Sequence, residues 1–215
     1  MKKINADAVI LDVDGTIWDS TPVVAKAWTS ALNELDEYKD RVLTADELKT
    51  MFGKTMDQIE QILMPDVEEE KRHRVCVHCF ELEDRVLAEC DDDLTYPGVV
   101  EVIEEVGKSL PVCIVSNAQK GYIELVIEKT GLSCVKDHLC FGDTLLDKDE
   151  NIRMVCERNG YKNAVYVGDT AGDLALSRKA GVGFIWASYG FGEIDREEAD
   201  AVIDNPQQLK EVLGL

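Results

Sequence analysis

The sequence predicts an α/β protein in which a doubly wound parallel sheet carries an inserted all-helical domain. Three observations predict this fold. An apolar run opens the chain at residues 6–11, and from about residue 94 onward similar short runs alternate with amphipathic segments of helical length. Between Trp18 and Asp93 the pattern is helical throughout, with no strand signal. Alternating strands and helices favour a parallel sheet covered on both faces.

Composition is typical of a folded protein and excludes several partners. The chain has 215 residues, of which 45% are hydrophobic and 31% charged, and its net charge is −20. Nucleic acids and anionic membrane surfaces attract basic proteins, so neither is an expected partner. No run approaches the ~20 apolar residues of a membrane span, and a cytoplasmic location is expected. The 7 Cys are predicted to be reduced, buried thiols.

The predicted helical insertion begins soon after the first strand. Ser20 or Thr21 is a candidate cap for its first helix, with Pro22 in the first turn, and Thr44 opens a second helix with the spacing of a capping box. The predicted helices of this region cover residues 23–35, a segment starting at 44, 56–63 and 67–89.

The remainder of the chain is predicted to form the other strands and helices of the sheet domain. The expected strands are 112–115, 139–141, 164–167, 182–185 and 201–203. Helices are expected at 99–108, 121–129, from about 149 to 158, up to 180, and after Pro206. The predicted domains are therefore 1–17 with 94–215 for the α/β core and 18–93 for the insertion.

Two carboxylates follow the first strand. Asp12 and Asp14 lie one residue apart and are followed by Gly15 and Thr16. Side chains alternate along a strand, so both aspartates leave on one side if the backbone stays extended, and Gly15 then allows a sharp exit. Two carboxylates that are this close repel each other, and a divalent cation such as Mg²⁺ would relieve the repulsion.

Later strands also end in polar side chains, and a lysine lies between two of them in the chain. These residues are Ser116 and Asn117, Asp169 and Asp173, and Lys148. In an open α/β sheet the carboxyl ends of the strands converge on one crevice. We therefore expect residues more than 150 positions apart in the sequence to share a site.

This constellation resembles the haloacid dehalogenase-like superfamily, and specifically its phosphatases. The insertion lies where phosphoglycolate phosphatase-like and β-phosphoglucomutase-like members carry a cap, and the matching motifs occur in order. They are Asp12-Val13-Asp14-Gly15-Thr16, the Ser116 strand end, Lys148, and Gly168-Asp169-Thr170-Ala171-Gly172-Asp173. The resemblance implies a Rossmann-like catalytic core, a helical cap and hydrolysis of a small phosphorylated metabolite.

The resemblance also implies roles for the two aspartates of the first motif. Asp12 would attack phosphorus and form an aspartyl-phosphate, which divides one difficult displacement into two easier ones. Asp14 would protonate the departing alkoxide and then activate water.

Mg²⁺ is the cofactor that the resemblance implies. It would be held by the carboxylates of Asp12 and Asp169 and by the backbone carbonyl of Asp14. Asp173 would orient Lys148 or a metal-bound water.

The same resemblance assigns the binding of the phosphoryl group. Ser116 and Lys148 would neutralise its charge, and the other expected phosphate contacts are Gly15, Thr16 and Asn117. By analogy with capped relatives, Lys54 and Trp18 are candidates for contact with the leaving group. Neither the particular metabolite nor the oligomeric state is predicted.

The lysine motif departs from the family pattern. Many phosphatases of this branch have Lys-Pro there, whereas Lys148 is followed by Asp149. Lys136 and Lys162 therefore remain alternatives, although the position of Lys148 directly before a predicted helix start favours it.

Three other classes of function compete with a phosphatase. A phosphomutase would need the same Asp12 and Asp14 but return the phosphoryl group to a sugar. A haloacid dehalogenase would not need the acid at Asp14, and a non-catalytic phosphate-binding module would need neither that acid nor a helical cap.

Two further patterns in the sequence suggest cofactor sites. His73, Cys76 and Cys79 have a spacing close to that of metal ligands, but no second Cys/His pair would complete a tetrahedral zinc site. The glycine pairs 181/183 and 190/192 lack the context of a dinucleotide-binding loop. Buried cysteines and ordinary turns are the preferred interpretations.

Overall fold

The computed structural model describes residues 2–215, and the chain divides into two compact units. The core unit comprises the chain up to Asp19 together with Thr95–Leu215, and the helical unit comprises Ser20–Leu94. The predicted fold class is confirmed, because the core unit is a parallel sheet with helices on both faces and the helical unit contains no strand among its described elements.

The core unit is built on a six-stranded sheet with the order β3-β2-β1-β4-β5-β6. Every pair of neighbouring strands is parallel. The strands are β1 (Ala8–Leu11), β2 (Val112–Ser116), β3 (Val135–Cys140), β4 (Ala164–Gly168), β5 (Gly183–Ala187) and β6 (Ala201–Ile203). All residues of β1, β2 and β4 are buried, which explains why these strands are continuous apolar runs instead of alternating ones.

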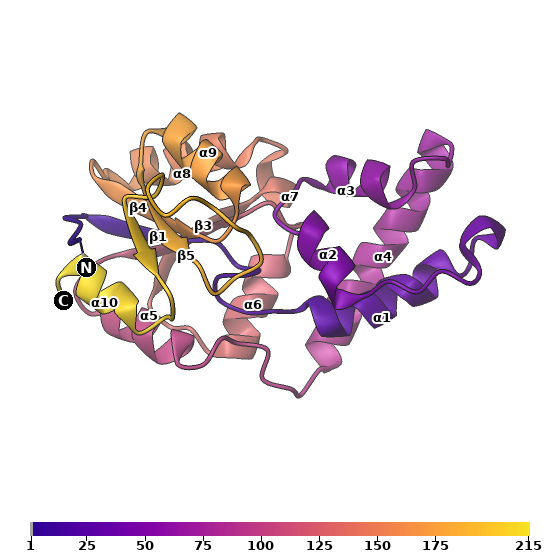
Figure 1. Cartoon of the computed structure of the whole chain (residues 1–215), viewed down its shortest axis with the longest axis horizontal. Coiled ribbons are helices and arrows are strands. Elements are labelled where there is room, and N and C mark those ends of the chain that lie inside the picture. Colours follow the sequence, from indigo (N-terminus) through magenta and orange to yellow (C-terminus); the bar gives the residue numbers. More distant parts are fainter. Residues whose placement is uncertain (1) are drawn as a thin grey trace. The chain divides into compact units, whose positions relative to one another are not determined.

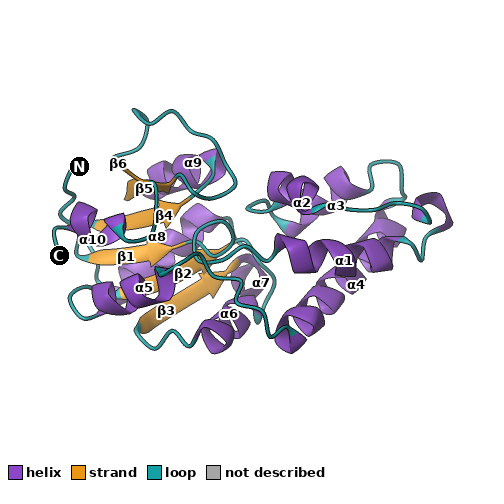
Figure 2. Ribbon diagram, turned by 60° about the horizontal axis from the view of Figure 1, so that its bottom comes forward, coloured by secondary structure: helices purple, strands orange, loops and turns teal. Residues whose placement is uncertain are grey.

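Helices cover both faces of this sheet (Figures 1 and 2). Helices α8 and α9 pack on one face and α5, α6 and α10 on the other. Their bounds are α5 (Val99–Gly107), α6 (Tyr122–Thr130), α7 (Phe141–Thr144), α8 (Lys148–Asn159), α9 (Ala171–Ala180) and α10 (Gln208–Leu213). The core between the sheet and α8 includes Ile10, Cys113 and Ile152, each fully buried.

The strand order places a topological switch point at β1. The chain builds β2 and β3 on one side of β1 and then crosses to β4 on its other side. The connections that leave β1 and β4 therefore diverge, and in such sheets the crevice at this point is where ligands bind. Asp12 follows β1 and Asp169 follows β4, so both residues lie at the carboxyl ends of the two central strands.

The two chain segments that lead to and from the insertion pair with each other within the core unit. Trp18 and Thr95 form an isolated antiparallel bridge, and the backbone N–H of Tyr96 donates to the carbonyl of Ile17 at 3.1 Å. The core unit therefore holds the two ends of the insertion side by side.

The helical unit packs its long helix α4 against α1 and α3, while α2 packs on α1. Its elements are α1 (Thr21–Leu32), the 3-10 helix η1 (Asp36–Tyr38), α2 (Ala45–Met51), α3 (Met56–Leu63) and α4 (Glu69–Glu89). Trp28 lies at the centre, with ring centroids 5.4 Å from Phe80 and 6.0 Å from Phe52. Thr44 and Glu47 form the capping box that the sequence predicts at the start of α2.

Helix α7 is the main element that the sequence did not predict. It follows β3 directly. The Asp143 carboxylate accepts from the backbone N–H of Cys140 at 3.0 Å and so caps this short turn from within. Within residues 2–215 no helix is both long and apolar enough to cross a membrane.

Candidate active site

Asp12 lies directly after β1, where its backbone N–H still donates to the carbonyl of Val167 at 2.9 Å. This bond continues the β1–β4 ladder by one residue and fixes the carboxylate at the end of the sheet. The side chain is 4% exposed, and its Oδ1 lies 3.1 Å from Nζ of Lys148. A buried carboxylate beside an ammonium group is thus held at the switch point.

Lys148 is the first residue of α8 and its side chain is fully buried. Its Nζ contacts Asp173 Oδ1 at 2.7 Å as well as Asp12, and lies 5.6 Å from the centre of the Tyr166 ring. The alternatives Lys136 and Lys162 are exposed. Of the three lysines that the sequence left open, the structure therefore brings Lys148 to Asp12.

Asp169 follows β4 and is fully buried. Its Oδ2 accepts a hydrogen bond from the backbone N–H of Phe191 at 2.6 Å, whereas its Oδ1 has no hydrogen-bond partner. A buried carboxylate oxygen without a donor is costly in a folded protein. This oxygen is the feature of the site that most requires a further ligand.

Glycines allow two loops to approach Asp169 closely. A Cβ at Gly15, where φ is +80°, would collide with the Asp169 carboxylate, and a Cβ at Gly190 would collide with Asp169 and with the Gly15 carbonyl. Gly192 is similarly close to the Asp169 carbonyl. The glycine pair 190/192, which the sequence did not connect with the site, thus serves to close the loop after β5 over Asp169.

Burial and mutual repulsion perturb the titration of these groups. Burial raises the pKa of Asp12 to about 7, although the Lys148 ammonium group acts in the opposite direction. Burial, together with the nearby Asp173 and Asp12, raises the pKa of Asp169 well above its usual value. Burial disfavours the charge of Lys148, but Asp12 and Asp173 outweigh it and raise the pKa of the ammonium group. The three carboxyl groups outnumber the one ammonium group, so burial and mutual repulsion disfavour their full ionisation without a cation.

Both oxygens of Asp173 are engaged, in contrast to Asp169, whose Oδ1 has no partner. Oδ1 accepts from Lys148, and Oδ2 accepts from the backbone N–H and hydroxyl of Thr170 at 3.0 and 2.7 Å. Thr170 in turn caps α9 by accepting from the Asp173 N–H. Asp173 is thus positioned to orient Lys148.

The three aspartates could hold a metal ion. Asp12, Asp169 and Asp173 each offer an oxygen, and these atoms lie within 4.8 Å of one another. In the part of the chain that the structure describes, they form the one such group of His, Cys, Asp or Glu residues. Carboxylate oxygens suit Mg²⁺, and the unpartnered Asp169 Oδ1 supplies a reason for a cation to bind. The residues present therefore fit Mg²⁺.

Asp14 lies beyond this group. Its side chain is half-buried, and its Oδ1 accepts hydrogen bonds from Trp18 Nε1 at 3.1 Å and from Tyr122 OH at 2.9 Å. Tyr122 was not anticipated from the sequence, because nothing in the pattern of α6 indicates a contact 108 positions away. Trp18 is 2% exposed.

The remaining predicted phosphate contacts follow β1 or lie at the end of β2. Ser116 is the last residue of β2, and its Oγ accepts from the Ala118 N–H at 3.4 Å. Asn117 is 6% exposed. Thr16 is buried, and its Oγ1 has no hydrogen-bond partner.

Lys54 belongs to the helical unit, between α2 and α3. Its Nζ donates to the carbonyl of Thr50 at 2.6 Å. Its contact with a leaving group stays a prediction.

Asp149 explains why Lys-Pro is absent from the lysine motif. The Asp149 side chain is fully buried, pairs with Arg153 one turn along α8, and accepts from Lys179 Nζ of α9 at 2.9 Å. The residue after Lys148 therefore joins two helices through a carboxylate, which proline could not provide.

The histidine and cysteines of α4 have structural partners. His73 Nδ1 lies 2.7 Å from the buried Glu60, and Cys76 and Cys79 are fully buried. Burial raises the pKa of both thiols, that of Cys79 to about 12, so both stay protonated. Among residues 2–215, the metal-ligand group formed by Asp12, Asp169 and Asp173 does not include these residues.

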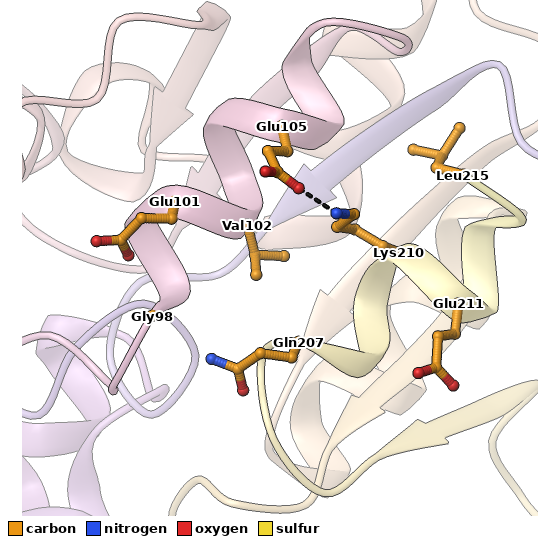
Figure 3. A pocket seen from close by; sticks show the side chains of 8 residues that line it. All are labelled: Gly98, Glu101, Val102, Glu105, Gln207, Lys210, Glu211 and Leu215. Carbon is orange, nitrogen blue, oxygen red and sulfur yellow. Dashed lines mark hydrogen bonds and ion pairs between the residues drawn. The ribbon is translucent and has the colours of Figure 1, made fainter.

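A groove of about 510 Å³ lies between α5 and α10 (Figure 3). An ion pair between Lys210 and Glu105 crosses it. Its lining residues are Gly98, Glu101, Val102, Glu105, Gln207, Lys210, Glu211 and Leu215. None of them is a candidate site residue, so this groove and the buried aspartates are separate features.

Together, the sheet order and the acidic group at its switch point define a doubly wound α/β protein whose crevice has carboxylates suited to a divalent cation. A family model described as haloacid dehalogenase-like hydrolase matches residues 9–187, and the chain belongs to this family. The match begins in β1 and ends with β5, so it spans the aspartate group and the insertion.

Individual relatives agree with this assignment. The chain is 25% identical to a phosphoglycolate phosphatase of Vibrio parahaemolyticus, over 96% of either chain, and 26% identical to the phosphoglycolate phosphatase of Escherichia coli strain K12, over 96% of this chain and 92% of the relative. A solved structure of a predicted phosphoglycolate phosphatase from Haemophilus somnus superposes with a TM-score of 0.83 at 18% identity, covering 96% of this chain and 97% of that one. The last comparison supports the fold, and the first two support a phosphatase.

Proposed function

We propose that this protein is a Mg²⁺-dependent phosphatase that hydrolyses a small phosphorylated metabolite through an aspartyl-phosphate on Asp12. The observation that carries the proposal is the buried Asp12 carboxylate beside Lys148, with the unpartnered Asp169 Oδ1 in the same group. Relatives that are named phosphoglycolate phosphatases make 2-phosphoglycolate the first substrate to test.

The chemistry would proceed in two displacements at phosphorus. A carboxylate oxygen of Asp12 attacks, the bond from phosphorus to the substrate oxygen breaks, and Asp14 gives its proton to the departing alkoxide. Asp14, now ionised, takes a proton from a water molecule, which attacks the aspartyl-phosphate. Inorganic phosphate leaves, and the carboxylate of Asp12 is restored.

Lys148 would keep Asp12 ionised and oriented, since its ammonium group lies 3.1 Å from Oδ1. Asp173 holds that lysine in place from the opposite side. Ser116, Asn117 and the Gly15-Thr16 turn would contact the phosphoryl oxygens.

Mg²⁺ would be held by Asp12 and Asp169 and by the Asp14 backbone carbonyl, where it would offset the negative charge of the site and polarise the substrate phosphate. Because both Asp173 oxygens have donors, we assign Asp173 to positioning Lys148 and not to the ion. Residues 18–93 would act as a cap that contributes to the choice of leaving group, with Lys54 as a candidate contact.

The test is a screen of the purified protein with Mg²⁺ against phosphomonoesters, including 2-phosphoglycolate and hexose phosphates. Release of inorganic phosphate from at least one of them, with loss of release in Asp12→Asn, is the expected result. Transfer of the phosphoryl group to a second hydroxyl without release would instead identify a phosphomutase.

A further inference from the structure

The turn after β1 brings the indole of Trp18 back to Asp14. The Val13 carbonyl accepts from the backbone N–H groups of Thr16 at 3.2 Å and Ile17 at 2.7 Å, and the Gly15 N–H donates to the Trp18 carbonyl at 2.9 Å. These bonds wind residues 13–18 into one compact turn. The side chains of Asp14 and Trp18 then meet, with Nε1 donating to Oδ1 at 3.1 Å.

A second donor reaches the same oxygen from the start of α6. Tyr122 is the first residue of α6, and its hydroxyl donates to Asp14 Oδ1 at 2.9 Å. Trp18 and Tyr122 are 2% and 1% exposed, and their rings meet edge to face with centroids 5.9 Å apart. Both donors are therefore locked by packing as well as by the hydrogen bonds themselves.

Two donors on one oxygen determine which oxygen of Asp14 can carry a proton. A protonated carboxyl group has one O–H donor, and the oxygen that already accepts two hydrogen bonds is the poorer place for it. Oδ1 is therefore the less favourable place for the proton, and the two bonds fix the plane of the carboxyl group. A general acid must present its proton within hydrogen-bond reach of the leaving oxygen, so this orientation bears directly on catalysis.

We propose that Tyr122 and Trp18 are positioning residues that hold Asp14 in the orientation for protonating the leaving group, and that they thereby extend the phosphatase to unactivated alkyl phosphates. The inference rests on the proposed role of Asp14 as general acid. An alkoxide is a poor leaving group and needs the proton, whereas p-nitrophenolate leaves readily without it. The two hydrogen bonds are thus needed for one class of substrate and nearly dispensable for the other.

The experiment compares kcat/KM for an alkyl phosphate, the best natural substrate of the screen, with that for p-nitrophenyl phosphate. This parameter reports the steps up to formation of the phosphoenzyme and is independent of its hydrolysis. Tyr122→Phe keeps the ring that packs on Trp18 and removes the hydroxyl alone. We expect it to lower kcat/KM for the alkyl phosphate at least about tenfold and kcat/KM for the aryl phosphate less than about threefold.

Trp18→Phe provides a second variant with the same expected direction. The double variant should approach the selectivity of Asp14→Asn, because all three changes act on one proton transfer. Tyr161→Phe is the matched control, since this hydroxyl contacts Cys113 of β2 and none of the candidate site residues. It should leave both substrates unchanged.

The outcomes separate the two levels of the proposal. Equal losses for the alkyl and aryl phosphates in Tyr122→Phe and Trp18→Phe, or no loss in either, would overturn the positioning role while leaving the phosphatase assignment intact. If Asp14→Asn itself shows no preference for the alkyl phosphate, the proposed acid role of Asp14 fails first. If Asp12→Asn still forms a phosphoenzyme, the proposed function fails altogether.

Discussion

Lys148 and Asp149 are neighbours in the chain, yet they belong to two opposite charge clusters. In the site cluster one ammonium group lies among the carboxylates of Asp12, Asp169 and Asp173. In the helix-joining cluster one buried carboxylate, that of Asp149, is shared by Arg153 and Lys179. Both clusters are buried at their acidic groups, and both begin at the first turn of α8.

The two clusters differ in whether every carboxylate oxygen has a partner. Asp149 has a cationic partner on each oxygen, so the cluster is complete and requires nothing further. The site cluster has more carboxyl groups than ammonium groups and a buried oxygen of Asp169 without a donor. A saturated cluster stabilises the fold, whereas an unsaturated one in a crevice indicates a place where a cation and a substrate complete the structure.

The largest effect is expected at the nucleophile of the site cluster. Asp12→Asn removes the proposed nucleophile, and we expect turnover of every phosphomonoester to fall at least about 1,000-fold. Steady-state kinetics and circular dichroism on the same preparation are the measurements. Considerable residual turnover by a correctly folded variant would assign the nucleophile elsewhere.

Metal removal tests whether the site cluster is incomplete. EDTA should abolish turnover, Mg²⁺ should restore it, and Mg²⁺ at about 100 times its Kd should stabilise the fold by about 2.7 kcal/mol. Asp169→Asn should weaken both responses, while Asp149→Asn, in the saturated cluster, should retain them. If the Tm of the wild-type protein does not change with Mg²⁺, the site cluster is not completed by this ion.

The same cluster predicts how stability depends on pH. The pKa of Asp12 is raised to about 7 and that of Asp169 is also raised, so the folded state binds protons more tightly than the unfolded one. Their ionisation therefore destabilises the metal-free protein above the unfolded pKa, and stability should recover as the pH falls through about 7. Thermal melts in EDTA at pH 8 and pH 6 should show this gain, and Mg²⁺ should reduce it.

Asp149→Ala tests the saturated cluster. It leaves Arg153 and Lys179 without their shared carboxylate, and since both cations are partly exposed we expect a loss of about 1–3 kcal/mol in the free energy of unfolding. Urea denaturation measures the loss, and kcat should change less than about threefold. Arg74→Ala, at an exposed ion pair with Glu70, is the control and should be nearly neutral. A large fall in kcat at unchanged stability would place Asp149 in the catalytic machinery instead.

The smallest effect is expected at Lys54. Unlike Lys148 and Lys179, which pair with carboxylates, Lys54 donates to a backbone carbonyl in the helical unit. If it contacts the leaving group, Lys54→Ala should lower kcat/KM for the best natural phosphate about tenfold, or 1.4 kcal/mol, and change p-nitrophenyl phosphate turnover little. Lys49→Ala, in the neighbouring helix α2, is the control for loss of a lysine from this region. An unchanged ratio between the two substrates would mark Lys54 as a solvated lysine.

The fold was predictable because its signals are local. The strand that ends before Asp12 and the strand that ends before Asp169 are continuous apolar runs, and the helices between strands have clear starts and stops such as the Thr170 cap and Gly160. Sequence order together with the rules of parallel sheets then places these strand ends at one edge. Helix α7 escaped prediction because its single turn depends on one side-chain cap.

The grouping of Asp12, Asp169 and Lys148 at one end of the sheet was predictable, but their individual contacts were not. Motif spacing identified Asp12 and Asp169, but burial of Lys148 could not be foreseen, since most lysines are exposed. Nor could the Tyr122 contact with Asp14, which depends on where α6 begins in space. Interactions between distant segments require the packed structure, because local pattern carries no information on which side chains meet.

Because Trp18 and Thr95 form an antiparallel bridge, the insertion connects two paired segments, as the loop of a β-hairpin does. Because the core holds positions 18 and 95 side by side, a turn of about two to five residues could replace residues 20–94 without altering the path of the sheet. Grafting a foreign domain onto this core, or removing the native one, would then require two junctions that lie side by side, next to the tryptophan that orients Asp14.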